Sequence, residues 1–165
     1  MSANGLPATI LIIRHGEKPD AKGNPHLSAL GRRRAEMIAQ TFPAMFHKLS
    51  MLFATAPSKD SNRPYETLEP LSDALNLRIN KSFADDEHSH LAKKLLADAT
   101  DYAGKTILIC WHHEKIPKLA RDDFGQASAP KKWPDEVFDQ IWQIDYAADG
   151  RATFNVKQQP PISAG

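Results

Sequence analysis

Two apolar runs constrain the fold more than any other feature of the sequence. The first, Ile10-Leu11-Ile12-Ile13, is rich in β-branched residues and has no polar alternation, and a second run of this kind spans Thr106–Trp111. Such runs are typical of strands that are buried on both faces of a parallel sheet. The sequence therefore predicts a parallel sheet in the interior of the molecule.

Helical periodicity follows the first run. Apolar side chains recur there at steps of three and four residues, at Ala35, Ile38, Ala39, Phe42 and Phe46. Polar side chains fall largely on the other side, which predicts an amphipathic helix with one buried face. Ser28 is a suitable N-cap for this helix. Gly31 lies on the apolar face, where glycine lowers helix propensity, so we interpret it as a point of close packing.

Further strands and helices alternate along the chain. Residues 50–56 resemble a third strand, and the polar loop 57–62 leads to a helix that we expect to begin near Arg63 or Pro64, because proline suits a first helical position. Another apolar stripe, ended by Gly104, consists of Leu91, Leu95, Ala99 and Tyr102. This alternation predicts an α/β fold, a three-layer α/β/α sandwich with a mostly parallel central sheet.

The carboxyl-terminal part predicts an antiparallel edge to that sheet. Residues 140–146 alternate imperfectly, and Asp149-Gly150 offers a hairpin turn into residues 152–156. The tail 158–165 contains two prolines and is expected to be poorly ordered. A chain of 165 residues has the length of one domain. We therefore expect a single domain over residues 1–165, with its core at about 7–157.

Composition argues against several functional classes. The 21 Lys and Arg residues against 20 Asp and Glu give a formal net charge of +1, too balanced for the basic stripe of a dedicated nucleic-acid binder. No apolar run approaches the roughly 20 residues that span a bilayer, and residues 1–7 lack the pattern of a signal peptide. The single cysteine, Cys110, excludes an intramolecular disulfide. We expect a cytoplasmic protein with no nucleic-acid or membrane partner.

The first predicted strand runs directly into Arg14-His15-Gly16-Glu17. The carboxyl ends of parallel strands are where α/β sheets place ligand sites. An imidazole there can act as a nucleophile, a guanidinium can hold two anionic oxygens, and glycine lets a backbone N–H approach them. The residues therefore indicate a phosphate site. The alternative is a strand-end histidine that caps carbonyls beside a surface arginine.

The rest of the chain supports the phosphate interpretation through a resemblance. Arg14-His15-Gly16-Glu17 is followed by a Leu-Ser pair with Gly31, Arg34 and Ala35, by Arg63 with Thr67, and by a strand that ends in Trp111-His112-His113. In this order and context the sequence resembles the histidine phosphatase superfamily, also called phosphoglycerate mutase-like. The resemblance covers roughly residues 10–120, and its most specific part is the strand with Arg-His-Gly-Glu. Phe138-Asp139 with Trp142 also looks like the last part of some small members.

The resemblance implies a covalent mechanism without metal or cofactor. By similarity, His15 attacks phosphorus, Arg14 and Arg63 bind the equatorial oxygens, and a second histidine completes the pocket. Phosphoryl transfer depends on positioning and charge stabilisation, which two arginines and two imidazoles can supply. His15 must be neutral to attack, so one ring nitrogen should donate to a backbone carbonyl.

The second histidine is either His112 or His113. Successive strand residues point to opposite faces, so we expect only one of the two histidines to enter the pocket. The other should be partly buried, with its ring nitrogens hydrogen-bonded. The interpretation leans to His113. Both remain candidates.

Two departures from the family pattern affect the site. In the family pattern, a turn of small residues and proline is followed closely by the arginine. Here residues 58–62, which look like a loop insertion, separate Ala56-Pro57 from Arg63. The acid that protonates the leaving oxygen has no clean motif; Asp85 and Glu87 are the best candidates and Glu17 and Glu114 the weaker ones. The acidic run 85–87 alternatively starts a solvated helix.

A metal-dependent hydrolase is the competing interpretation of the histidines. His88 and His90, with nearby aspartates and the His112-His113 pair, could form a zinc or manganese site. No helical His-Glu-x-x-His motif is present. We therefore predict a metal-independent phosphohydrolase, a phosphomonoesterase that acts through phosphohistidine on a small phosphorylated substrate or a phosphoprotein. The alternatives are a phosphohistidine protein phosphatase and a phosphate-binding module without catalysis.

Overall fold

The structure is a computed structural model that describes residues 4–162. In chain order its elements are β1 (Thr9–Arg14), α1 (Ala29–Met45), β2 (Leu49–Ala54), α2 (Arg63–Leu75), β3 (Ile79–Asn80), a 3₁₀ turn (Asp85–Glu87), α3 (His88–Ala97), α4 (Ala99–Tyr102), β4 (Thr106–Trp111), α5 (Ile116–Lys118), a π-helical turn (Leu119–Asp123), β5 (Gln140–Tyr146) and β6 (Ala152–Gln158). The predicted alternation of strands and helices is present.

The six strands form one mixed sheet in the order β3-β2-β4-β1-β5-β6. β1 to β4 pair in parallel, and β5 and β6 add an antiparallel edge. Arg14 pairs with Trp111 and Ala54 with Cys110, so β1, β4 and β2 end nearly level with one another. The carboxyl ends of three parallel strands therefore meet at one edge.

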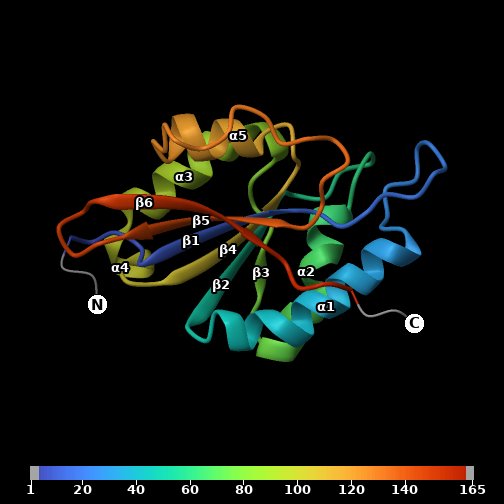
Figure 1. The fold of residues 1–165 in the computed structure, drawn as a ribbon, viewed down its shortest axis with the longest axis horizontal. Coiled ribbons are helices and arrows are strands. Elements are labelled where there is room, and N and C mark those ends of the chain that lie inside the picture. Colours follow the sequence, from blue (N-terminus) through green and yellow to red (C-terminus); the bar gives the residue numbers. More distant parts are fainter. Residues whose placement is uncertain (1–3, 163–165) are drawn as a thin grey trace.

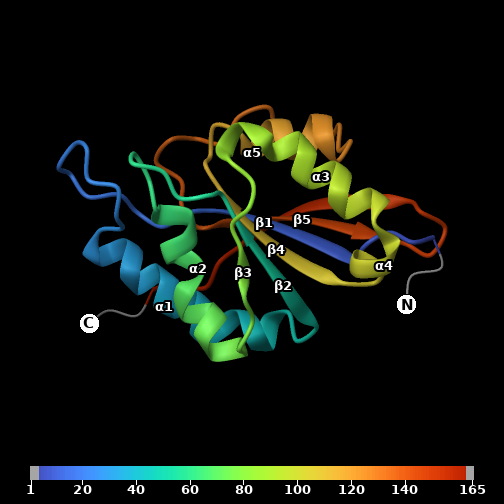
Figure 2. The ribbon, with the colours of Figure 1, turned by 180° about the vertical axis from the view of Figure 1, so that it is seen from behind.

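Helices cover both faces of the sheet (Figures 1 and 2). α1 and α2 pack on one face against a core that includes Leu11, Ile13 and Leu108. α3, α5 and the π-helical turn pack on the other, against Ile10, Ile12 and neighbouring side chains. Residues of β1 alternate between the two clusters, because consecutive strand residues point to opposite faces. The predicted three-layer α/β/α sandwich is confirmed.

Local signals of the sequence account for several of these elements. Ser28 caps α1, because its Oγ accepts from the N–H of Gly31 at 3.0 Å. Gly31 is a packing contact as predicted: a Cβ there would lie 2.5 Å from the carbonyl oxygen of Glu17. α2 begins at Arg63 with proline in its first turn. The hairpin through Asp149-Gly150 joins β5 and β6 in antiparallel pairing.

Two segments differ from the prediction. The stripe from Leu91 to Tyr102 belongs to two helices, because the chain breaks at Asp98, whose side chain accepts from the N–H of Asp101 and starts α4. The tail is also better anchored than expected. β6 extends to Gln158, and Gln159 is only 3% exposed. The end of the predicted flexible tail, 163–165, lies outside the described residues.

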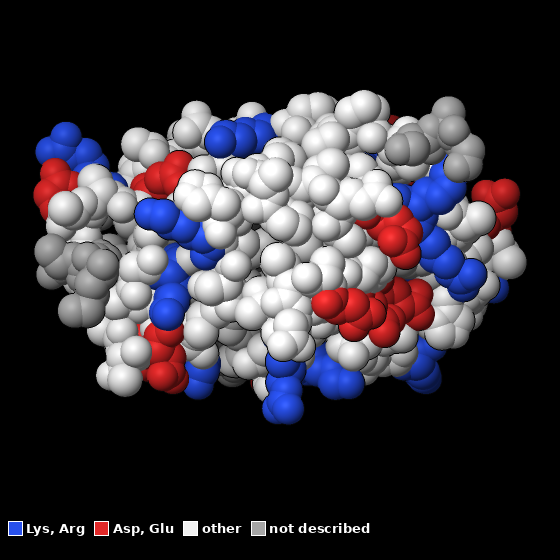
Figure 3. Space-filling model, turned by 90° about the horizontal axis from the view of Figure 1, so that it is seen from below, with Lys and Arg blue, Asp and Glu red and all other residues white. Residues whose placement is uncertain are grey.

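The surface carries mixed charges on the face drawn in Figure 3. Lys and Arg lie there in small groups interspersed with Asp and Glu. In the part of the chain that the structure describes, no helix combines the length and hydrophobicity needed to cross a bilayer.

Candidate active site

The topology brings the predicted site residues to one edge of the sheet. His15 directly follows β1 and His112 directly follows β4, and these two strands are neighbours. From there the chain continues to α1 on one face of the sheet and to α5 on the other (Figure 1). Adjacent strands whose connections diverge leave a crevice at their carboxyl ends, which is the usual ligand site of an open α/β sheet.

A cleft of about 390 Å³ opens at this edge. Five of the predicted site residues and one of the weaker acid candidates line it: His15, Arg63, Asp85, His112, His113 and Glu114. Lys18 and three residues of the loop 57–62 complete the lining, which is polar or charged throughout. The inserted loop is therefore one wall of the cleft, and Arg63 reaches the cleft in spite of the insertion.

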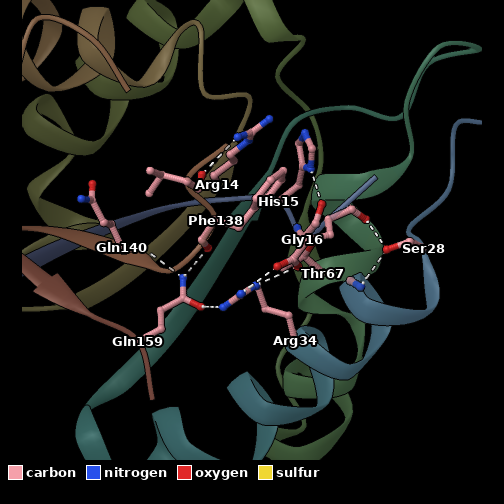
Figure 4. A network of polar contacts seen from close by, with 12 residues as sticks. Arg14, His15, Gly16, Ser28, Arg34, Thr67, Phe138, Gln140 and Gln159 are labelled. Carbon is pink, nitrogen blue, oxygen red and sulfur yellow. Dashed lines mark hydrogen bonds and ion pairs between the residues drawn. The ribbon is translucent and has the colours of Figure 1, made fainter. Parts of the chain in front are cut away.

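His15 is held as a neutral imidazole with a defined tautomer. Its side chain is buried, and its Nδ1–H donates to the carbonyl oxygen of Gly16 at 2.7 Å (Figure 4). Burial, together with the positive charges of Arg14 and Arg63, keeps the pKa of His15 well below its usual value. The proton therefore resides on Nδ1, and Nε2 carries a lone pair. The expected carbonyl that fixes the tautomer is confirmed.

Arg14, which directly precedes His15, is 1% exposed and is not among the residues that line the cleft. Its Nη1 donates to the carbonyl oxygens of Asp135 and Val137, and its guanidinium carbon lies 3.8 Å from the ring centroid of Phe138. Burial lowers the pKa of Arg14 to about 10, so the group is charged at neutral pH. Its buried Nε has no hydrogen-bond partner among the described residues. Two carbonyls thus hold Nη1 in place, and the N–H at Nε has a hydrogen bond left to donate to an anion.

Arg63 approaches the cleft from the first turn of α2. Its Nη1 donates to the carbonyl oxygen of Asn24 at 2.8 Å, which leaves its buried Nε, like that of Arg14, without a partner within residues 4–162. Arg63 lines the cleft with His15, and Arg14 precedes His15 in the chain. The charges of both arginines lower the pKa of His15. The pair supplies two positive charges and two unsatisfied donors beside one potential nucleophile.

Both histidines after β4 line the cleft, although only one was expected to. β4 ends at Trp111, so the strand alternation behind that expectation no longer applies to the next two residues. The ring of His112 lies 5.3 Å from that of His15 in an edge-on arrangement, whereas Nε2 of His113 is 3.0 Å from Oδ1 of Asp135. Geometry thus favours His112, and not His113, as the partner of His15.

Asp85 is the acid candidate that lies in the cleft with a raised proton affinity. It starts the 3₁₀ turn, and burial raises the pKa of its carboxyl. Its Oδ1 is buried and has no partner in the described part of the chain. The indole N–H of Trp111 donates to the main-chain carbonyl of Asp85 at 3.1 Å, which ties this turn to the end of β4. Asp85 is therefore the acid candidate in the cleft whose carboxyl has a raised pKa and an unpartnered oxygen within the described residues.

Two other predicted acids have structural partners. Glu87 reaches back to the N–H of Ala84 at 2.8 Å and caps its own turn, so it does not line the cleft. Glu17 forms a two-pronged ion pair with Arg34, at 2.9 and 2.8 Å. Glu114 lines the cleft and is exposed. Of the four candidates, Asp85 and Glu114 remain at the site.

Gly16 has a different role from the one expected. Its N–H, predicted to approach the anion, donates instead to Oγ1 of Thr67 at 2.8 Å. A Cβ on Gly16 would lie 2.9 Å from the carbonyl oxygen of Gly31, so the position requires a residue without one. The glycine thus lets β1 and α1 approach each other and fixes the turn that carries His15.

The histidines of the competing metal interpretation are dispersed. His88 pairs through Nδ1 with Asp123, and Nδ1 of His90 lies 3.7 Å from Glu87. Neither lines the cleft with His112 and His113. Within residues 4–162, no three His, Cys, Asp or Glu side chains are grouped so that they could hold a metal ion.

Solved structures share this fold. The putative phosphohistidine phosphatase SixA from Agrobacterium tumefaciens matches with a TM-score of 0.56 and 15% identity, over 92% of this chain and 97% of that one. A protein histidine phosphatase SixA complexed with tungstate matches with a TM-score of 0.56 and 16% identity, over 91% of this chain and 96% of that one. Phosphoglycerate mutase from Plasmodium falciparum matches with a TM-score of 0.59 and 12% identity, over 95% of this chain and 96% of that one.

The chain has a phosphoglycerate mutase-like fold. No family model and no curated protein matches its sequence. The likeness is therefore one of three-dimensional structure, and it agrees with the resemblance drawn from the motif at the end of β1.

Proposed function

We propose that this chain is a metal-independent phosphohydrolase of the histidine phosphatase superfamily that forms a phosphohistidine intermediate on His15. The observation that carries the proposal is the state of this residue: it is a buried, neutral imidazole whose Nδ1–H donates to a carbonyl, and it lines a polar cleft together with Arg63. A nucleophile needs a free lone pair and an electrophile held in front of it. Nε2 of His15 with Arg14 and Arg63 meets both needs.

In the first half-reaction, Nε2 of His15 attacks the phosphorus of a phosphomonoester. The P–N bond forms as the bond between phosphorus and the ester oxygen breaks. Arg14 and Arg63 balance the charge on the equatorial oxygens, and neutral His112 adds an N–H donor. Asp85 gives its proton to the departing oxygen, which leaves as an alcohol. The raised pKa of Asp85 suits this role, because a general acid must hold its proton near the working pH.

In the second half-reaction, water attacks the phosphohistidine. The P–N bond breaks, a new P–O bond forms, and the proton that the water loses returns to the carboxylate of Asp85. Inorganic phosphate leaves, and His15 regains its neutral form. The cleft is open, so the substrate is either a small phosphorylated molecule or a phosphorylated side chain of a protein. The similarity to SixA favours a phosphohistidine protein as the second candidate.

Hydrolysis of para-nitrophenyl phosphate by wild type and His15→Ala, with and without EDTA, tests the proposal. We expect turnover that EDTA does not change, and a loss of about a thousandfold or more in His15→Ala, because a covalent nucleophile has no substitute. His47→Ala is the matched control, since His47 is exposed and does not line the cleft. Activity that EDTA abolishes and zinc or manganese restores would support the metal alternative, and phosphate binding without turnover would support a binding module.

A further inference from the structure

Gln159 is buried although it lies beyond the last strand. Its backbone N–H donates to the carbonyl oxygen of Asp139 at 2.7 Å. Its side-chain NH₂ donates to the carbonyl oxygens of Phe138 at 3.3 Å and Gln140 at 3.1 Å. Its Oε1 accepts from Nη1 of Arg34 at 3.0 Å. One amide thus joins the entry of β5 to helix α1 (Figure 4).

The Arg34 side of this network leads to the residues that follow His15. Arg34 holds the carboxylate of Glu17 with two hydrogen bonds. The carbonyl oxygen of Glu17 in turn accepts from the N–H and Oγ of Ser28 at 3.0 and 3.1 Å. Glu17 is two residues beyond His15, so Arg34 fixes the turn that carries the imidazole.

The Phe138 side of the network leads to Arg14 and His15. The ring of Phe138 stacks on the guanidinium of Arg14 at 3.8 Å, and its centroid lies 6.3 Å from that of His15. The main chain of Phe138 is bonded to the side chain of Gln159. A shift of this main chain would move the surface on which Arg14 rests.

We infer that Gln159 is a positioning residue of the active site, which holds Phe138, and through its ring Arg14, in a fixed position relative to His15. The inference rests on the proposed function, because it concerns the alignment of Arg14 with a phosphoryl group on His15. It also explains why an amide stands here. Glutamine has two donors for the two carbonyls and one acceptor for Arg34, whereas glutamate has no donor and alanine has neither.

The test compares Gln159→Ala and Gln159→Glu with Gln158→Ala. Gln158 is the adjacent residue of the same type and is exposed, which makes it a matched control. Steady-state kinetics with para-nitrophenyl phosphate, and binding of vanadate as an analogue of the transition state, are measured on each variant. Circular dichroism confirms that each is folded at the assay temperature.

We expect kcat and vanadate affinity to fall about tenfold in both Gln159 variants, with KM changed less than about twofold, because misalignment weakens contacts made in the transition state. Because the variants are compared while folded, a role in stability alone predicts kinetic constants like those of Gln158→Ala in both of them. Gln159→Glu retains the acceptor for Arg34 but loses the bonds to the Phe138 and Gln140 carbonyls, so we expect its kcat to fall as in Gln159→Ala.

Kinetic constants and vanadate affinity within twofold of Gln158→Ala in folded Gln159 variants would overturn the inference and leave the proposed function intact. Recovery of activity in Gln159→Glu would also overturn it. Failure of the wild type both to hydrolyse the substrate and to bind vanadate would overturn the proposed function itself, and this inference with it.

Discussion

The side chains of Arg14 and Arg63 are held in opposite ways. Arg14 is buried, with two backbone carbonyls on one side of its guanidinium and an aromatic ring against its face. Arg63 is partly exposed, and its guanidinium makes one hydrogen bond within residues 4–162, to the carbonyl oxygen of Asn24 in the loop between β1 and α1. Arg14 is thus part of the packed interior, whereas Arg63 is held by a surface loop.

In the proposed anion site, one arginine is thus part of the fold and the other is accessible to solvent. The contacts of Arg14 orient it before any ligand binds, which lowers the cost of ordering the site. The same contacts make Arg14 part of the stability of the fold. Arg63 makes no comparable contribution to stability. Substitution of Arg14 should therefore reduce both activity and stability, whereas substitution of Arg63 should reduce activity alone.

Substitution of Arg14 has the larger expected effect. In Arg14→Met, kcat/KM should fall about a hundredfold, at the upper end of the 1.5 to 3 kcal/mol of a charge-assisted hydrogen bond. The unfolding free energy should also fall by about 1 to 3 kcal/mol, because partly buried carbonyls lose a donor. Urea denaturation and steady-state kinetics measure the two losses. A variant with native stability would contradict the structural role of Arg14.

Substitution of Arg63 should reduce function alone. In Arg63→Met, kcat/KM should fall about tenfold, for one charge-assisted contact, and the unfolding free energy should change by no more than about 0.5 kcal/mol. Arg63→Lys should recover little, because a point charge cannot reproduce the planar fork. Equal loss of stability in the Arg14 and Arg63 variants would remove the distinction between the two regions.

The pH dependence of stability tests whether the charge of Arg63 acts on the histidines of the cleft. Burial, with the charge of Arg63, lowers the pKa of His112 to about 4 from an ordinary value of 6.5. As the pH falls below about 6.5, the unfolded chain therefore takes up a proton before the folded one. We expect full stability above this pH and a progressive loss towards about pH 4.

Urea denaturation across this pH range measures the loss and separates its causes. Arg63→Met should make the loss smaller, because one of the charges that lower the pKa of His112 is gone. His47→Ala should leave the curve unchanged, since His47 is exposed. A loss that is identical in wild type and Arg63→Met would show that Arg63 does not act on the histidines.

Much of the fold could be predicted because its signals are local or periodic. The unbroken apolar runs of β1 and β4, the cap at Ser28 and the Asp149-Gly150 turn each depend on the residue types at those positions. His15 could be singled out for the same reason, since it directly follows a buried strand.

The parts that could not be predicted depend on contacts between distant backbone atoms. Every residue has a carbonyl, so nothing in the sequence marks those of Asp135 and Val137 as partners of Arg14. Gln159 likewise lies in a proline-containing tail, and its burial depends on Arg34, 125 residues away. Glu87 looked like an acid for catalysis, but the N–H of Ala84 is within its reach.

The central claim, that Nε2 of His15 forms a bond to phosphorus, is tested most directly by trapping the intermediate. Wild type is mixed with para-nitrophenyl phosphate, quenched in base to preserve phosphohistidine, and digested for mass spectrometry. The account predicts one acid-labile phosphoryl group on the peptide that contains His15, and none in His15→Ala. A protein that turns over rapidly with no phosphoryl group on His15, or with one on another residue, would contradict it.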